Sequence, residues 1–408
     1  MSELDNQNPT VYGRNIKVAL FSVFRHGTGY ANYAISRAMA LNAAGVDVVL
    51  RSSTMFPQHM KPVPSLIEEL ERKSLTGVDT VIQLCLPHTF CRTGGARNIG
   101  EFIWETSRFY RPDWTKHCSM MDEIWTTCLQ SRKAIKDSRL SRITTSAFPI
   151  STDMAKFDEP YETLDFGKHS GRCLFYTIGE WVNRKNFDGM LRAYYNAFTH
   201  RDRVALVIKT SFPGKGGEDE RTQVAAEIGR IKESMRRFGN PATYPPVLLF
   251  TGTWSDTDIH RLHRTGNVFV SLSHGEGWCI PCHDALCHGR PVIASNWGAF
   301  PELVCEQGAM YWDDDAGQFK NPGDIRAGWL IPGTLDYCTG TSERFPDLYT
   351  GSERWFMPSL PEATRAMREA YQEWCKGTLA DRSPQVEAVG RRFTHEFVGQ
   401  LLKGALTC

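Results

Sequence analysis

The sequence predicts an α/β protein with two Rossmann-like lobes, each built on a parallel β-sheet. The chain has 408 residues, whereas a single hydrophobic core stops growing at about 250–300 residues. Residues 15–50 contain a buried apolar strand, a glycine-containing turn, a helix and a second strand, the order that is typical of a parallel sheet. A second series of the same kind begins at residue 171, after a polar segment. We therefore expect two sheets that face a central cleft.

The first lobe is expected to span residues 1–160. Its first strand (15–24) is followed by a helix (31–44), which Gly45 ends. The next apolar runs read as strands at 46–50, 80–86, 98–104, 121–127 and 143–147. A basic helix begins near Gln130, and the polar segment 149–168 is expected to join the lobes.

The second lobe is expected to span residues 161–384. Strands are predicted at 171–178, 204–209, 247–250, 268–272 and 291–294, with a helix at 186–199. Residues 213–219 read as a mobile loop, and 311–349 as an irregular segment rich in Gly, Asp and Pro. The tail, 385–408, predicts one helix (385–406) that returns to the first lobe.

Composition excludes several classes of protein. The formal net charge is +1, so no global field attracts nucleic acid or membranes. No run of about 18 apolar residues exists, and the polar N-terminus lacks a signal core, which predicts a cytoplasmic protein. The 12 cysteines are scattered through apolar segments, so we expect buried free thiols rather than disulfides.

The most informative segment is 271–295, where a strand runs into the turn Gly275-Glu276-Gly277 and then into a helix that ends at Gly289. The two glycines allow close approach of a ligand, and the helix N-terminus favours an anion such as a diphosphate. Asp284 lies eight positions after Glu276. Two acceptor-only carboxylates at this spacing suit sugar and ribose hydroxyls.

This segment resembles the donor-binding motif of the retaining GT-B glycosyltransferases of family 4, in which two acidic residues are separated by seven. The second acid here is Asp284, where the family usually has Glu. The similarity continues through 289–292 and 298–304. The segment 177–186 also resembles a family motif, in which a basic residue binds the donor diphosphate. Glu180 departs from it, because many relatives have Arg directly after Gly179; Arg184 beside Lys185 would supply that charge.

The resemblance assigns roles to further residues. Thr253, with the helix 256–264, would border the nucleotide base, and Gly27, Thr28 and Gly29 would face the diphosphate from the first lobe. The residues that the resemblance places against the donor are Gly27, Thr28, Gly29, Gly179, Thr253, Gly275, Gly277, Trp278, Cys279 and Asp284.

The acceptor side departs from the family pattern. Many relatives carry a histidine there, whereas this chain has Trp104 and Glu105, and the nearest histidine is His88. We interpret Glu105 as the acceptor-side residue, with His88 as the alternative. Together with Glu276, Lys185 and Arg184, Glu105 completes the predicted catalytic set.

The resemblance implies retaining transfer of a sugar from a nucleotide-diphosphate sugar to an acceptor hydroxyl, without a metal or other cofactor. A glycan or a lipid-linked sugar is the default acceptor. The alternatives are a phage-type enzyme that glycosylates hydroxymethylated DNA bases, a nucleotide-sugar epimerase of the same two-lobe shape, and a non-catalytic binding module. Cys279 and Cys282 could also suggest zinc or haem, but no second pair has ligand spacing.

The predicted acceptor lobe contains a run of basic residues, in which Asp137 is the one acidic residue: Arg132, Lys133, Lys136, Arg139 and Arg142. This run allows two interpretations, a solvated helix face or peripheral contact with an anionic partner such as a membrane surface or nucleic acid.

Overall fold

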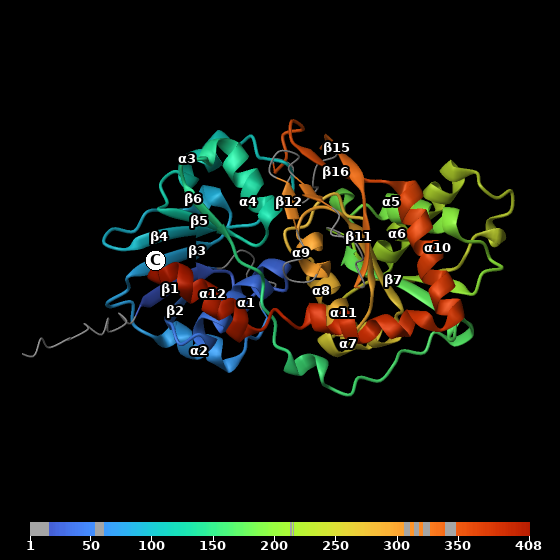
Figure 1. The fold of residues 1–408 in the computed structure, drawn as a ribbon, viewed down its shortest axis with the longest axis horizontal. Coiled ribbons are helices and arrows are strands. Elements are labelled where there is room, and N and C mark those ends of the chain that lie inside the picture. Colours follow the sequence, from blue (N-terminus) through green and yellow to red (C-terminus); the bar gives the residue numbers. More distant parts are fainter. Residues whose placement is uncertain are drawn as a thin grey trace, which may run out of the picture.

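The computed structural model describes residues 16–53, 61–212, 214, 216–305, 311–313, 318–320, 327–338 and 348–408. The chain forms two lobes side by side, each built on a six-stranded parallel sheet flanked by helices (Figure 1). The predicted α/β fold with two Rossmann-like lobes, the GT-B arrangement, is confirmed.

The first sheet has the strand order β2-β1-β3-β4-β5-β6. Its strands are β1 (Lys17–Ser22), β2 (Asp47–Ser52), β3 (Thr80–Leu84), β4 (Arg97–Glu101), β5 (Glu123–Thr126) and β6 (Thr144–Ala147). Its helices are α1 (Gly29–Ala43), α2 (Ser65–Arg72), α3 (Pro112–Cys118) and α4 (Leu129–Ile135). Every residue of β3 is buried, because helices cover both faces of a parallel sheet.

The second sheet has the order β14-β11-β10-β7-β8-β9. Its strands are β7 (Cys173–Glu180), β8 (Val204–Ser211), β9 (Val247–Phe250), β10 (Val268–Ser271), β11 (Val292–Ser295) and β14 (Gly328–Ile331). Its helices are α5 (Phe187–Ala197), α6 (Gly217–Met235), α7 (Asp256–Thr265), α8 (Ile280–Cys287), α9 (Phe300–Val304) and α10 (Leu360–Lys376). The strand order reverses between β7 and β10, which is where sheets of this kind bind ligands.

Two predictions in the second lobe are wrong for the residues that the structure describes; residues 213, 215, 314–317, 321–326 and 339–347 lie outside the described ranges. The segment 311–349 is not irregular throughout, because β14 completes the sheet and β15 (Gly333–Tyr337) pairs with β16 (Arg354–Pro358). A Cβ atom on Gly328 would lie 2.1 Å from the Val292 carbonyl oxygen, so β14 depends on a close contact that sequence periodicity does not reveal. Gly217 to Asp219 open α6 rather than belonging to a loop.

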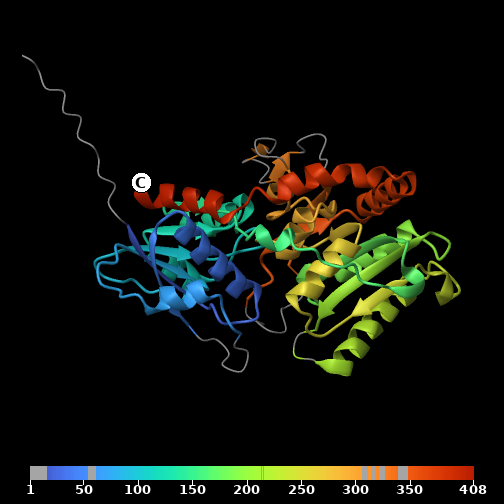
Figure 2. The ribbon, with the colours of Figure 1, turned by 90° about the horizontal axis from the view of Figure 1, so that it is seen from below.

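The tail forms two helices instead of one, α11 (Ser383–Gly390) and α12 (His395–Thr407). The helical path is interrupted before α12, which begins after Thr394. The Thr394 hydroxyl caps α12 by accepting a hydrogen bond from the Phe397 amide at 3.1 Å. Only α12 reaches the first lobe, where Lys403 Nζ donates to the Ala44 carbonyl at 2.9 Å. Figure 2 shows the last helices running from the second lobe across to the first.

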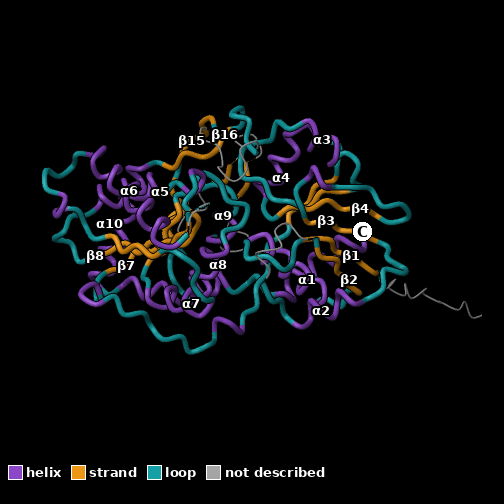
Figure 3. Tube along the Cα trace, turned by 180° about the vertical axis from the view of Figure 1, so that it is seen from behind, coloured by secondary structure: helices purple, strands orange, loops and turns teal. Residues whose placement is uncertain are grey.

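The segment between β6 and β7 crosses from one lobe to the other and contains the short turn Ala155–Phe157 (Figure 1). Figure 3 shows the two lobes from behind, with strands and helices in each. All 12 cysteines are free thiols and most are buried, as predicted. In the part of the chain that the structure describes, no helix is both long and apolar enough to cross a membrane.

Candidate active site

The residues after β7 are fixed against the end of β10. Asn183–Lys185 form a single tight turn, and Asn186 follows in the left-handed conformation with φ 52°. The Asn186 side chain accepts from the Gly189 amide at 3.0 Å and donates to the Leu272 carbonyl at 2.8 Å. This double anchor holds Arg184 and Lys185 beside the turn that carries Glu276.

Glu276 is the centre of a buried charge cluster. Lys185 Nζ donates to Glu276 Oε1, and Arg184 Nη1 lies 3.3 Å from Glu276 Oε2. The Ser273 hydroxyl donates to Oε1 at 2.9 Å. Burial raises the pKa of Glu276, but Lys185 and Arg184 oppose burial and bring that pKa below its usual value. The carboxylate is therefore ionised and pairs with both cations.

Gly298 holds the backbone of Glu276 in place. It has φ 66°, and a Cβ atom there would lie 2.2 Å from the Glu276 carbonyl oxygen. That oxygen accepts from the Ala299 amide at 2.9 Å. Position 298 therefore requires glycine, because no larger residue fits against the turn.

Glu105 reaches the same cluster from the first lobe. Its Oε1 atom lies 3.7 Å from Arg184 Nη2, so the guanidinium stands between carboxylates of both lobes. Burial raises the pKa of Glu105, although Arg184 opposes this shift. His88, the alternative acceptor-side residue, is exposed and stacks on Trp114 with ring centroids 6.3 Å apart. Of the two, the structure brings Glu105 into the cluster.

Gly275 and Gly277 lie against the first lobe. A Cβ atom on Gly277 would be 1.8 Å from Ile103 Cγ2, and one on Gly275 would be 2.5 Å from the Glu105 carbonyl oxygen. The Thr127 hydroxyl also donates to the Gly277 carbonyl. These glycines therefore permit the two lobes to meet at the turn, a role that sequence reasoning did not give them.

Asp284 lies on α8, away from the Glu276 cluster, and has a partner that sequence reasoning missed. Lys156 Nζ, from the segment between the lobes, lies 3.1 Å from Asp284 Oδ1. Burial raises the pKa of Asp284, but Lys156 and nearby histidines lower it by more. No sequence signal marks Lys156, because its segment reads only as a polar linker. Ser273 was missed as well, although it lies inside the motif.

Part of the second lobe is similar to a known protein family. Residues 172–322 match the family of glycosyl transferases group 1. The match covers 151 of the 408 residues, all within the second lobe. The group 1 match contains the Glu276 cluster and Asp284, but neither Glu105 nor Lys156.

The curated relatives of this chain include the O-antigen chain mannosyltransferase B of Escherichia coli, which is 30% identical over 151 residues. That match covers 37% of this chain and 33% of the relative. A match to the sulfoquinovosyl transferase of Arabidopsis thaliana covers 24% of this chain and 18% of the relative at 29% identity. The chain thus aligns with a third or less of these relatives.

Solved structures share the whole two-lobe fold. Anabaena HepE, in complex with UDP and glucose, has a TM-score of 0.58 at 11% identity and covers 96% of this chain and 99% of its own. Sucrose-phosphate synthase from Thermosynechococcus elongatus has a TM-score of 0.56 at 14% identity, with 96% and 98% covered.

The remaining predicted donor residues lie in different surroundings. Gly179 is the penultimate residue of β7 and lies next to the Lys185 side chain, while Thr253 is exposed in the loop after β9. Trp278 is buried and packs on Phe393 of the tail, with ring centroids 5.1 Å apart. Cys279 is buried at the start of α8.

The first-lobe loop lies at the start of α1. Thr28 caps this helix by accepting from the Ala31 amide at 3.4 Å, and a Cβ atom on Gly27 would lie 3.0 Å from Lys61 Cε. Gly29 has open space around it. Within the described ranges, no group of three or more His, Cys, Asp or Glu side chains could hold a metal ion.

Proposed function

We propose that this chain is a metal-independent, retaining glycosyltransferase that moves a sugar from a nucleotide-diphosphate sugar to an acceptor hydroxyl. The observation that carries the proposal is the contact of Glu276 with both Lys185 and Arg184 at the point where the second sheet reverses its strand order. Two cations and one carboxylate at such a point suit a substrate with a diphosphate at one end and hydroxyls at the other.

Lys185 and Arg184 would bind the donor diphosphate. As the bond from the anomeric carbon to the phosphate oxygen breaks, negative charge develops on that oxygen, and preorganised cations stabilise it. The guanidinium offers a planar set of donors and the ammonium a compact charge, so the pair can hold two phosphate oxygens at once. No metal ion is needed for this step.

Glu276 would then exchange part of its ion pairing for sugar hydroxyls, which donate hydrogen bonds to its oxygens. Asp284 would accept from the ribose hydroxyls. The acceptor oxygen forms its bond to the anomeric carbon on the face that the diphosphate leaves, and its proton passes to a donor phosphate oxygen. Glu105, which lies across from Arg184, would orient the acceptor.

The relatives guide the choice of substrates. HepE was solved with UDP and glucose, and the bacterial relative is named as a mannosyltransferase, so a hexosyl donor is the first choice. The name of the bacterial relative also makes a glycan the first acceptor class to test, followed by a lipid-linked sugar.

A donor screen tests the proposal. Thermal unfolding would be followed with UDP, GDP, ADP and their sugar conjugates for the wild type, Lys185→Ala and Glu276→Ala. A ligand at 100 times its dissociation constant adds about 2.7 kcal/mol of stability, a shift that is easily resolved. We expect one nucleotide family to stabilise the wild type and Lys185→Ala to lose most of that response.

The matched control is Arg192→Ala, which removes a surface cation of α5 that pairs with Asp188. It should respond to the donor like the wild type. With the donor known, the anomeric configuration of the product, read by proton NMR in the presence of EDTA, tests retention and metal independence together. Inversion, or loss of transfer in EDTA, would contradict the mechanism.

A further inference from the structure

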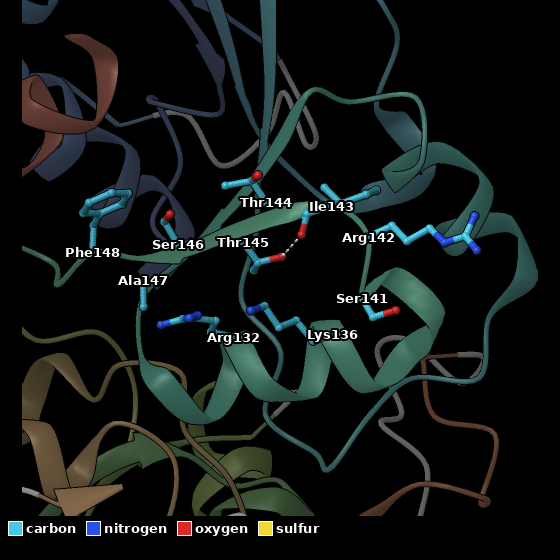
Figure 4. Close-up of a pocket in the computed structure, with 10 residues that line it drawn as sticks. All are labelled: Arg132, Lys136, Ser141, Arg142, Ile143, Thr144, Thr145, Ser146, Ala147 and Phe148. Carbon is cyan, nitrogen blue, oxygen red and sulfur yellow. Dashed lines mark hydrogen bonds between the residues drawn. The ribbon is translucent and has the colours of Figure 1, made fainter. Parts of the chain in front are cut away.

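A basic groove lies on the first lobe between α4 and the edge strand β6. It has a volume of about 600 Å³, and Arg132, Lys136 and Arg142 line it together with the hydroxyl residues Ser141, Thr144 and Ser146. Figure 4 shows the Arg132 and Lys136 side chains rising from the helix toward β6, with Arg142 at the far end. The lining of the groove combines positive charge with hydroxyl groups and contains no carboxylate.

The cations of the groove have no acidic partner in the described part of the chain. Lys133 pairs with Asp137 at 3.2 Å, whereas no ion pair between described residues involves Arg132, Lys136 or Arg142. Arg132 and Lys136 are four positions apart, so they project from the same face of α4 and the turn that continues it. The positive charges of these side chains repel each other, and an anion bound between them would offset this repulsion.

The backbone shapes this cation pair into a groove. The basic run is not one helix, as the sequence suggested, because Arg139 has φ 67° and the chain turns back there to enter β6. Among the described strands, β6 pairs with β5 alone, so no described strand covers its outer edge. The Phe148 amide donates to Thr126, and peptide groups alternate along a strand, so the amides of Thr145 and Ala147 point to the open edge. They add backbone donors to the cationic side chains.

The groove begins beside the candidate active site. The Thr127 hydroxyl, which precedes α4, donates to the Gly277 carbonyl, and the Leu129 amide donates to Glu302 Oε1 of the second lobe at 2.6 Å. Arg132 follows less than one turn of helix after Leu129. Among the cations of the groove, Arg132 is therefore nearest in sequence to these contacts between the lobes.

We propose that this groove binds a phosphate group carried by the acceptor, outside the donor site. The assignment to an acceptor rests on the proposed function. Charge, hydroxyl groups and strand amides all suit phosphate oxygens, which accept several hydrogen bonds at once.

The lining disfavours two other anionic partners. None of the large exposed apolar side chains among the described residues lies between 129 and 148, so this surface offers nothing to insert into a membrane. Phe148, the one aromatic residue of the lining, is buried against Trp125 with ring centroids 4.8 Å apart. It is not free to stack on a nucleic-acid base.

Calorimetric titration with sodium tripolyphosphate tests the groove. We expect the wild type to bind it and the Arg132→Gln/Lys136→Gln variant to bind at least tenfold more weakly. Lys133→Gln removes a neighbouring charge that pairs with Asp137 and should bind like the wild type. All variants are compared in a Lys185→Ala background, because Lys185 of the proposed donor site would itself bind tripolyphosphate. Equal binding with and without the Arg132→Gln and Lys136→Gln substitutions would overturn the proposal.

Two further arms identify the source of the phosphate. Vesicles of phosphatidylcholine with phosphatidylglycerol, and a short duplex DNA, would be tested with the same variants. Binding of either through Arg132 and Lys136, without tripolyphosphate binding, would overturn the proposal in favour of a membrane or nucleic acid. The donor screen and this titration can fail separately. If tripolyphosphate binds in the groove but no nucleotide sugar stabilises the protein, only the proposed function is contradicted.

Discussion

The Lys156 ammonium nitrogen lies 3.1 Å from a carboxylate oxygen of Asp284 and thereby ties the segment between the lobes to helix α8. The pair brings a cation to the carboxylate that is predicted to hold the ribose. Lys156 keeps the pKa of Asp284 low against burial, which by itself would raise it. The pair therefore keeps Asp284 ionised as a strong hydrogen-bond acceptor.

Replacing Lys156 by Gln should weaken donor binding five- to tenfold, about 1 to 1.4 kcal/mol. Without Lys156 the pKa of Asp284 rises, so the carboxylate takes up a proton at a higher pH than in the wild type. The loss should thus be larger at pH 5 than at pH 8, as titration calorimetry with the donor would measure. Lys168→Gln, an exposed change in the same segment, is the control. A pH-independent loss would contradict this account.

Replacing Lys185 by Met should lower kcat about 100-fold, as loss of one preorganised donor does in other enzymes. Glu276 keeps its contacts with Arg184 and Ser273, so the variant should still fold. Initial-rate kinetics and circular dichroism would measure both effects. Arg192→Ala should leave the rate unchanged, and a wild-type rate in Lys185→Met would remove this residue from the reaction.

Glu302 should make stability depend on pH. Burial raises the pKa of Glu302 to about 7, although the hydrogen bond that its carboxylate accepts from the Leu129 amide lowers this pKa. A raised carboxyl pKa means that the folded state holds the proton more tightly than the unfolded chain. The resulting stability is present below about pH 4.5 and is lost as the pH rises through about 7.

Urea unfolding between pH 4.5 and 7.5 would measure this effect. The Glu302→Gln variant cannot ionise, so its free energy of unfolding should rise relative to the wild type by up to about 3 kcal/mol across this range. Glu159→Gln, at an exposed position, should follow the wild type at every pH. If the free energy of unfolding changed with pH in the same way for Glu302→Gln and the wild type, Glu302 would not be the group whose pKa is raised by folding.

Gly277→Ala should force the lobes apart. The new Cβ atom would lie 1.8 Å from Ile103 Cγ2, and overpacking of this kind costs about 1–3 kcal/mol. Small-angle X-ray scattering should show a larger radius of gyration. Adding Ile103→Ala removes the atom in the way and should restore the wild-type value. Gly29→Ala, with open space around the glycine, is the control.

The sequence alone determined the two-lobe α/β fold, since alternating apolar strands and helices with glycine turns are local patterns. It also determined that Glu276, Arg184 and Lys185 follow two strands of one sheet. That β7 and β10 are neighbours, and that these three residues therefore meet, was decided by the tertiary structure.

Other features depended on tertiary contacts from the start. β14 forms because Gly328 fits against Val292, and the tail bends at Thr394 so that α12 can cover α1. Lys156 reaches Asp284 across 128 residues of sequence, and the basic groove exists because β6 is left at the sheet edge. Sequence periodicity reports the local environment of each residue, whereas these contacts join residues that only the packing of the lobes brings together.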